Sequence, residues 1–144
     1  MFSTIVVGTD GSDTARQAVI EAAETARATG AKLVVVSAYT PVAAHVQAGG
    51  DPEAADWNIG PDVLVEGVLT DATSASAASG VKVETRAVRG DAADALIEVA
   101  EQEGADLIVV GNKGMTGARR FLLGSVPNKV SHHAPCSVLI VRTS

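Results

Sequence analysis

The chain has 144 residues, of which 47% are hydrophobic and 19% are charged, a balance that allows a sizeable core and argues against disorder throughout. The net charge of −6 argues against nonspecific binding to nucleic acid or to an anionic membrane, because both need a basic surface. The single cysteine excludes an internal disulfide, and no apolar run approaches the ~20 residues that span a bilayer. The opening MFSTIVVGTDGS lacks the charged and apolar regions of a signal peptide, so we expect a cytoplasmic protein.

Five segments have the composition of strands. They are Thr4–Thr9, Lys32–Tyr39, Val81–Val88, Asp106–Val110 and Ser137–Arg142. Four of them are short, continuous, β-branched runs, which is typical of a parallel sheet that is covered on both faces. The segment Val81–Val88 alternates apolar and polar residues instead, so we expect a less deeply buried strand there.

Helical patterns occupy the intervals between these strands. They are Asp13–Thr29, Asp62–Ser79, Asp91–Glu103 and Ser125–His133. Ser12 is suited to cap the first helix and Gly30 to end it, while Pro127 is tolerated in the first turn of the last one. The alternation of strands and helices predicts a single doubly wound α/β domain over residues 1–144, with helices on both faces. The stretch 40–61 is the one long irregular segment, and its role stays open.

Ligands of an open α/β sheet bind beyond the carboxyl ends of the strands, where the strand order reverses. The segments expected there are residues 8–12, 37–41, 89–91 and 111–114, and three of the four contain glycine, as close approach of backbone to a ligand requires. Asp10 lies just past the first strand. Its carboxylate could hydrogen-bond a ribose or hold Mg²⁺ near phosphates, or it could stabilise its own turn.

The stretch GNKGMTGARRFLLGS, residues 111–125, follows the fourth predicted strand. Gly111 and Gly114 could offer unhindered backbone N–H groups to phosphate, and Gly124-Ser125 falls at the start of a helix, where unpaired N–H groups favour anions. The hydroxyl of Ser125 could cap that helix or donate to a phosphate oxygen. Local cations are Lys113, Arg119 and Arg120. Neither of the common nucleotide-binding motifs, G-x-x-x-x-G-K-[ST] and G-x-G-x-x-G, is present. The spacing alone is therefore also compatible with two ordinary loop glycines and with arginines that face solvent.

No nucleophile–base pair such as G-x-S-x-G is found in the sequence, so no catalytic residue is predicted. His132 and His133 are adjacent and would diverge on a helix, which favours a helix C-terminus over a metal pair. Cys136 precedes a predicted buried strand, and we expect it in the core.

The spacing Gly111-x₂-Gly114-x₉-Gly124-Ser125 resembles the G-2x-G-9x-G-[ST] signature of the universal stress protein family, in its nucleotide-binding branch. The segments IVVGTDGSDTA, ADLIVVGNKG, LLGSVPNKV and PCSVLIVR are similar to that family too, and actinobacterial single-domain members are especially similar. The resemblance implies a Rossmann-like sheet of order 3-2-1-4-5, with ATP across the carboxyl ends of the first and fourth strands. It further implies nucleotide contacts from Gly8, Thr9, Asp10, Ala38, Gly90, Val110, Gly111, Gly114, Gly124, Ser125 and Val126.

Partners and alternatives also follow from this resemblance. Asp10 would meet Mg²⁺ that arrives with ATP, and two copies of the chain would pair through Ser137–Arg142. Cyclic AMP is an alternative ligand that the signature does not separate from ATP, and slow Mg²⁺-dependent ATP hydrolysis is an alternative activity. Whether Arg119 and Arg120 reach the ligand stays open.

Overall fold

The computed structural model describes residues 2–39, 61–77, 80–112 and 124–143, and within 61–77 it describes the side chains of 66–74. The strands are β1 (Thr4–Gly8), β2 (Lys32–Tyr39), β3 (Val83–Arg89), β4 (Leu107–Gly111) and β5 (Ser137–Val141). The helices are α1 (Asp13–Thr29), α4 (Pro61–Ala77), α5 (Ala92–Glu103) and α6 (Ser125–His133). All strand pairs are parallel and the order is β3-β2-β1-β4-β5, which confirms the predicted topology.

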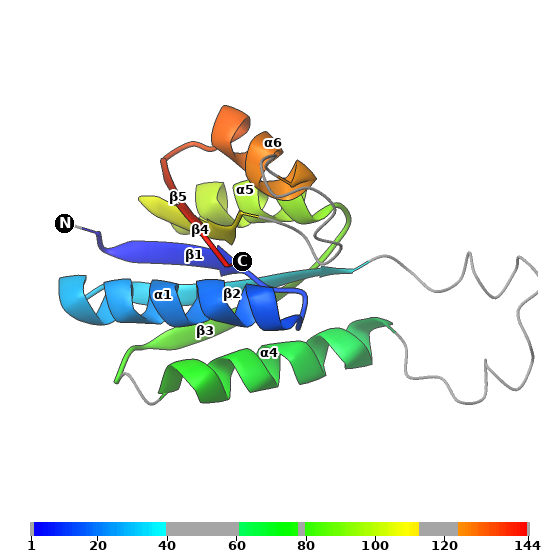
Figure 1. Cartoon of the computed structure of the whole chain (residues 1–144), viewed down its shortest axis with the longest axis horizontal. Coiled ribbons are helices and arrows are strands. Elements are labelled where there is room, and N and C mark those ends of the chain that lie inside the picture. The colour runs from blue at the N-terminus through cyan, green and yellow to red at the C-terminus, as the bar shows by residue number, and fades with distance from the viewer. Residues whose placement is uncertain (1, 40–60, 78–79, 113–123, 144) are drawn as a thin grey trace, which may run out of the picture.

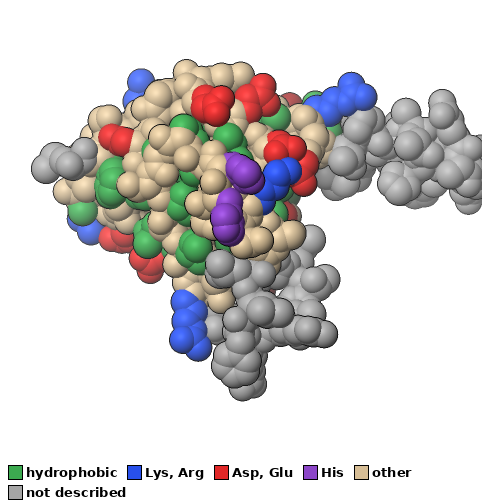
Figure 2. Space-filling view, turned by 90° about the horizontal axis from the view of Figure 1, so that it is seen from above, with side chains coloured by type: hydrophobic (Ala, Val, Ile, Leu, Met, Phe, Trp, Pro, Cys, Tyr) green, Lys and Arg blue, Asp and Glu red, His purple; other side chains and the backbone are tan. Residues whose placement is uncertain are grey.

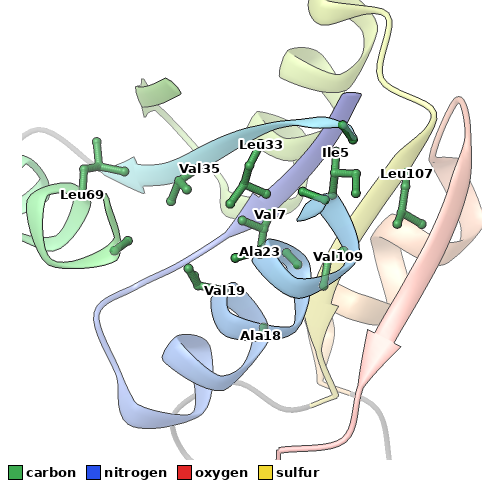
Figure 3. Close-up of a cluster of buried hydrophobic side chains, with 14 residues drawn as sticks. Ile5, Val7, Ala18, Val19, Ala23, Leu33, Val35, Leu69, Leu107 and Val109 are labelled. Atoms are coloured by element: carbon green, nitrogen blue, oxygen red, sulfur yellow. The ribbon is translucent and has the colours of Figure 1, made fainter. Parts of the chain in front are cut away.

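Helices cover both faces of the sheet: α1 and α4 lie on one side, α5 and α6 on the other (Figure 1). Successive side chains of a strand point to opposite faces. Ile5 and Val7 of β1 therefore pack in the α1 and α4 layer (Figure 3), whereas Val6 packs against α5 and α6. All three side chains are fully buried. The sheet therefore has a hydrophobic core on each face, which explains why its central strands are continuously apolar.

The edge strand β3 differs from the central strands, as its alternating sequence predicts. None of its residues is fully buried, and two of its charged side chains, Glu84 and Arg86, form ion pairs with neighbouring elements. The carboxylate of Glu103, on α5, lies 3.0 Å from Lys32 Nζ and 2.8 Å from Arg86 Nη1. Lys32 also lies 2.9 Å from Glu84 of β3, so this network attaches the edge strand to β2 and to α5.

The helix ends are set by local sequence. Ser12 accepts a hydrogen bond from the Ala15 N–H at 3.1 Å and thereby caps α1, and Gly30 ends that helix in the left-handed conformation at φ 74°. Both features confirm the predictions. The start of α5 differs by one residue, because Asp91 is the N-cap, accepting from the Asp94 N–H, rather than the first helical residue. No helix in the described part of the chain is both long enough and apolar enough to cross a membrane.

Candidate functional site

A pocket lies at the carboxyl ends of the central strands, between the α1 and α6 N-termini. Its lining consists of Gly8, Thr9, Asp10, Ser12, Thr14, Ala15, Val36, Ala38, Ala92, Leu96, Val110, Gly111, Val126 and Pro127. Strand β1 is paired with β2 on one side and β4 on the other, so the chain order reverses here. This is the position where doubly wound sheets bind ligands.

The pocket has an apolar part and a polar part. Val36, Leu96 and Val110 contribute aliphatic side chains, whereas Thr9 and Asp10 contribute oxygen atoms. The cavity volume of about 120 Å³ is of the order of the ~150 Å³ cavity that accepts a benzene ring. The pocket therefore suits one planar aromatic group, and a larger ligand must extend past the polar part.

The polar part is formed by the loop between β1 and α1, which is fixed by its own hydrogen bonds. The Thr9 N–H donates to Val36 O at 2.9 Å, and the Gly11 N–H donates to Thr9 Oγ1 at 3.2 Å. The Ser12 N–H donates to Asp10 Oδ1 at 2.9 Å, so Asp10 does stabilise its turn. A carboxylate can accept about four hydrogen bonds, which leaves capacity for a ligand hydroxyl or a cation.

Packing leaves little room for a side chain at two glycines of this segment. A Cβ atom on Gly8 would lie 3.0 Å from Leu96 Cδ1, and one on Gly11 would lie 2.8 Å from Val68 Cγ2. Gly11 also has φ +85°, a conformation that only glycine adopts without strain. Gly11 was not among the predicted site residues, although the GTDGS turn contained the signal for it.

The N-termini of α1, α5 and α6 differ in how their N–H groups are satisfied. Ser12 and Asp91 cap α1 and α5, and both of these helices carry an acidic residue in the first turn. Helix α6 has Gly124 as its N-cap, with no side-chain cap and no acidic residue in its first turn. The capping alternative for Ser125 is therefore wrong, because Ser125 is the first helical residue. Among the described residues, the N–H groups of Ser125 and Val126 have no hydrogen-bond acceptor, and the partial positive charge of the helix adds to them.

Asn112 joins the end of β4 to the start of α6. Its backbone oxygen accepts the Gly124 N–H at 3.0 Å, and its own N–H donates to Val141 O at 2.8 Å. Its side-chain oxygen accepts the Thr143 N–H at 2.9 Å. These bonds hold Asn112 and Gly124 side by side at the edge of the pocket, next to the lining residue Gly111.

The predicted site residues fall into four groups. Seven line the pocket: Gly8, Thr9, Asp10, Ala38, Val110, Gly111 and Val126. Gly124 and Ser125 lie at the adjoining start of α6, while Gly90, at φ 128°, donates its N–H to Tyr39 O at 2.7 Å and is not in the lining. The residues Gly114, Lys113, Arg119 and Arg120 lie outside the described part of the chain.

The lining also contains residues that the sequence prediction missed. They are Ser12, Thr14, Ala15, Val36, Ala92, Leu96 and Pro127. Most of them lie at or near the start of a helix, whereas Val36 lies inside β2. Ser12 belongs to the segment 8–12 that was expected at this edge, whereas the others are brought to the cavity only by the strand order and the helix orientation, which no local motif marks.

The two histidines of α6 do not form a metal site with other described residues. His132 and His133 occupy the last helical turn, with Nδ1 of His132 2.7 Å from Asn128 O. They are exposed side by side on the α5 and α6 side of the molecule (Figure 2). Over the described ranges, no three His, Cys, Asp or Glu side chains come together as a metal site.

The strand order and the position of the pocket define an α/β protein of the doubly wound, Rossmann-like class. A sequence model of the universal stress protein family matches residues 1–142, and the chain belongs to that family. Universal stress protein Rv1636 of Mycobacterium tuberculosis is 41% identical over 144 residues, which cover 99% of this chain and 98% of the relative. These findings confirm the resemblance that the sequence motifs indicated.

Two solved structures extend the comparison. The crystal structure of Rv1636 from Mycobacterium tuberculosis H37Rv superposes with a TM-score of 0.60 at 40% identity, over 99% of this chain and 97% of that one. A universal stress protein crystallised in complex with cAMP superposes with a TM-score of 0.76 at 38% identity, over 99% of both chains.

Proposed function

We propose that the protein binds an adenine nucleotide, ATP in the first place, and acts in the cytoplasm as a stress-response regulator, sensor or nucleotide store. The observation that carries this proposal is the combination of an apolar pocket, a carboxylate at its edge and an uncapped helix N-terminus beside it. These three features match the three parts of a nucleotide, namely base, ribose and phosphate. The cAMP complex of a relative at 38% identity supports the same ligand class.

In this proposal each part of the nucleotide meets different residues. The adenine lies in the apolar part of the pocket next to Ala38, and Asp10 accepts hydrogen bonds from the ribose. The phosphates bind the N–H groups at the start of α6 and the backbone of Gly111 and Gly114. The N–H groups of Gly90 and Gly124 already donate to Tyr39 O and Asn112 O, so these two glycines do not bind phosphate through them.

A magnesium ion fits this site only together with phosphate. Asp10 is one carboxylate, and the described residues bring no further acidic group into a metal cluster with it. Mg²⁺ is commonly held by one or two carboxylates plus the phosphates of a nucleotide. Asp10 would then hold Mg²⁺ that arrives with ATP, and removing Mg²⁺ should weaken ATP binding without affecting the binding of cyclic AMP.

Cyclic AMP is the second candidate ligand, and the complex of the related structure favours it directly. Its single phosphate needs few contacts, and the two free N–H groups of α6 could supply them. Slow ATP hydrolysis is a further alternative. Mg²⁺-dependent ADP release that disappears in Asp10→Ala would support it.

The first experiment is mass analysis of small molecules released from freshly purified protein, followed by titration calorimetry with ATP, cyclic AMP and GTP. We expect roughly micromolar binding of ATP, weaker binding of GTP, and co-purified adenine nucleotide. Folded protein that binds neither ATP nor cyclic AMP would contradict the proposal.

The pocket itself is tested by filling it. Ala38→Leu adds three carbon atoms beside the proposed adenine position, so the affinity for ATP should fall at least about tenfold, equivalent to roughly 1.4 kcal/mol. Ala28→Leu makes the same change on the exposed surface of α1 and serves as the matched control. Equal affinities of the two variants would show that the nucleotide binds elsewhere.

A further inference from the structure

A second, smaller cavity lies between α1 and α4, on the other side of the loop that carries Asp10. Its lining includes Thr9, Gly11, Ser12, Val68 and Asp71. Thr9 and Ser12 also line the larger pocket, so the loop 9–12 is a wall common to both cavities. Helix α4 contributes to the second cavity, whereas none of its described residues lines the first.

The loop is in tight contact with α4 at one point. A Cβ atom on Gly11 would lie 2.8 Å from Cγ2 and 3.5 Å from Cγ1 of Val68. The Gly11 backbone therefore rests directly against the two methyl groups of this side chain. Because Gly11 holds φ +85°, the direction in which the chain leaves the contact is set as well.

A short chain of bonds links this contact to the nucleotide pocket. The N–H of Ser12 belongs to the peptide unit that follows Gly11, and it donates to Asp10 Oδ1 at 2.9 Å. At the other end of the loop, Thr9 is fixed independently by its bond to Val36 of β2. The orientation of the Asp10 carboxylate thus depends on Gly11, and Gly11 depends on Val68.

We infer that Val68 is a positioning residue of the nucleotide site, acting through Gly11 and Ser12 on the carboxylate of Asp10. This inference rests on the proposed function. It assigns α4 a part in nucleotide affinity, although none of the described side chains of α4 lines the pocket. Shortening Val68 removes the support of the loop, and lengthening it pushes the loop toward the pocket, so both changes should weaken binding.

The test measures the dissociation constant of ATP with Mg²⁺ and the unfolding midpoint of each variant. Val68→Ala should weaken binding roughly two- to tenfold, the range expected between coupled neighbours. Leu69→Ala is the matched control, because Leu69 is buried on the same helix but lines neither cavity. It should lower the unfolding midpoint more than Val68→Ala and leave the dissociation constant within about twofold.

A double-mutant cycle with Asp10→Ala separates positioning from a general loss of stability. If Val68 acts through Asp10, Val68→Ala should have no further effect on affinity in the Asp10→Ala background. Additive effects would overturn the inference. Should Val68→Ala fail to fold, Val68→Ile enters the same cycle, with weaker binding expected and unchanged binding contradicting the inference.

The two proposals can fail separately. If the wild-type protein binds no nucleotide, the proposed function is wrong. If the wild-type protein binds ATP, and Asp10→Ala weakens this binding but neither Val68 variant does, only the inference about Val68 is wrong.

Discussion

Asp106 shows how a single side chain can connect distant parts of the fold. Its carboxylate accepts the backbone N–H of Ser3 at 2.9 Å and that of Thr4 at 3.1 Å, and the Ser3 hydroxyl at 3.1 Å. Burial by itself would raise the pKa of Asp106, but these hydrogen bonds outweigh it and hold the pKa below its ordinary value. The ionised carboxylate thus fastens the start of β1 to the start of β4.

This arrangement predicts a pH dependence of stability. Because the pKa of Asp106 is lower in the folded state, its contribution is complete above the unfolded pKa of about 3.9 and is lost as pH falls through the folded value. Asp106→Asn should lower the free energy of unfolding at pH 7 by about 1–2 kcal/mol, and this difference from wild type should shrink below about pH 4.

Denaturant titrations between pH 3 and pH 7 measure the effect. Glu24→Gln is the control, since Glu24 pairs with Arg27 on the exposed surface of α1 and such pairs contribute little. A difference between Asp106→Asn and wild type that stays constant down to pH 3 would contradict the assignment.

Residue roles of this kind were the least predictable from the sequence. Asp106 was recognised as the beginning of a strand, but its partner Ser3 lies 103 positions away. Gly11 was visible in the GTDGS turn, whereas its contact with Val68 arises only once α4 packs beside α1. By contrast the positions of Asp10 and Gly111 in the pocket lining could be predicted, because they lie at the carboxyl ends of strands that share one edge of the sheet, whereas Ala38 followed from the family resemblance.

At the scale of elements, the prediction succeeded where the signals are local. The bounds of α1 and α6 agree with the predicted ones, since Ser12 and Gly30 at the ends of α1 act through neighbours in sequence. The bounds of β3 shifted from Val81–Val88 to Val83–Arg89, because the pairing of an edge strand depends on its partner β2.

Helix α6 offers a prediction in which stability and binding change in opposite directions. Ser125→Asp places a negative charge on the first helical residue, where it should stabilise the helix by about 0.3–1 kcal/mol. The same charge should repel the nucleotide phosphates and weaken ATP binding about tenfold or more, less so at high salt. Calorimetry and thermal unfolding measure the two effects.

The matched control uses the other end of the same helix. Ser131→Asp adds the same charge near the C-terminus of α6, where the charge is unfavourable to the helix and remote from the pocket. It should lower stability and leave ATP affinity unchanged. If both variants weaken ATP binding equally, net charge rather than the free N–H groups of α6 governs the affinity.

On the scale of the whole molecule, the two edges of the sheet are not equivalent. The β3 edge carries Glu84, Arg86 and Arg89, and charged residues discourage pairing with another strand. The β5 edge reads SVLIV, and Leu139 is 38% exposed. An apolar edge strand of this kind can pair with the same strand of a second chain, which supports the proposed dimer through Ser137–Arg142.

If the proposed dimer forms through β5, the asymmetry of the edges predicts which substitution would separate it. Leu139→Lys places a charge on the β5 edge and should convert the dimer to a monomer at about micromolar concentrations, because the two lysines of a symmetric pair would also repel each other. Thr85→Lys makes an equivalent exposed change on β3 and should leave the dimer intact. Light scattering coupled to size exclusion gives the masses, and circular dichroism shows whether each variant is folded. A wild-type monomer, or a folded Leu139→Lys variant that is still a dimer, would show that β5 is not the interface. If Thr85→Lys alone dissociates the dimer, the interface lies at β3 instead.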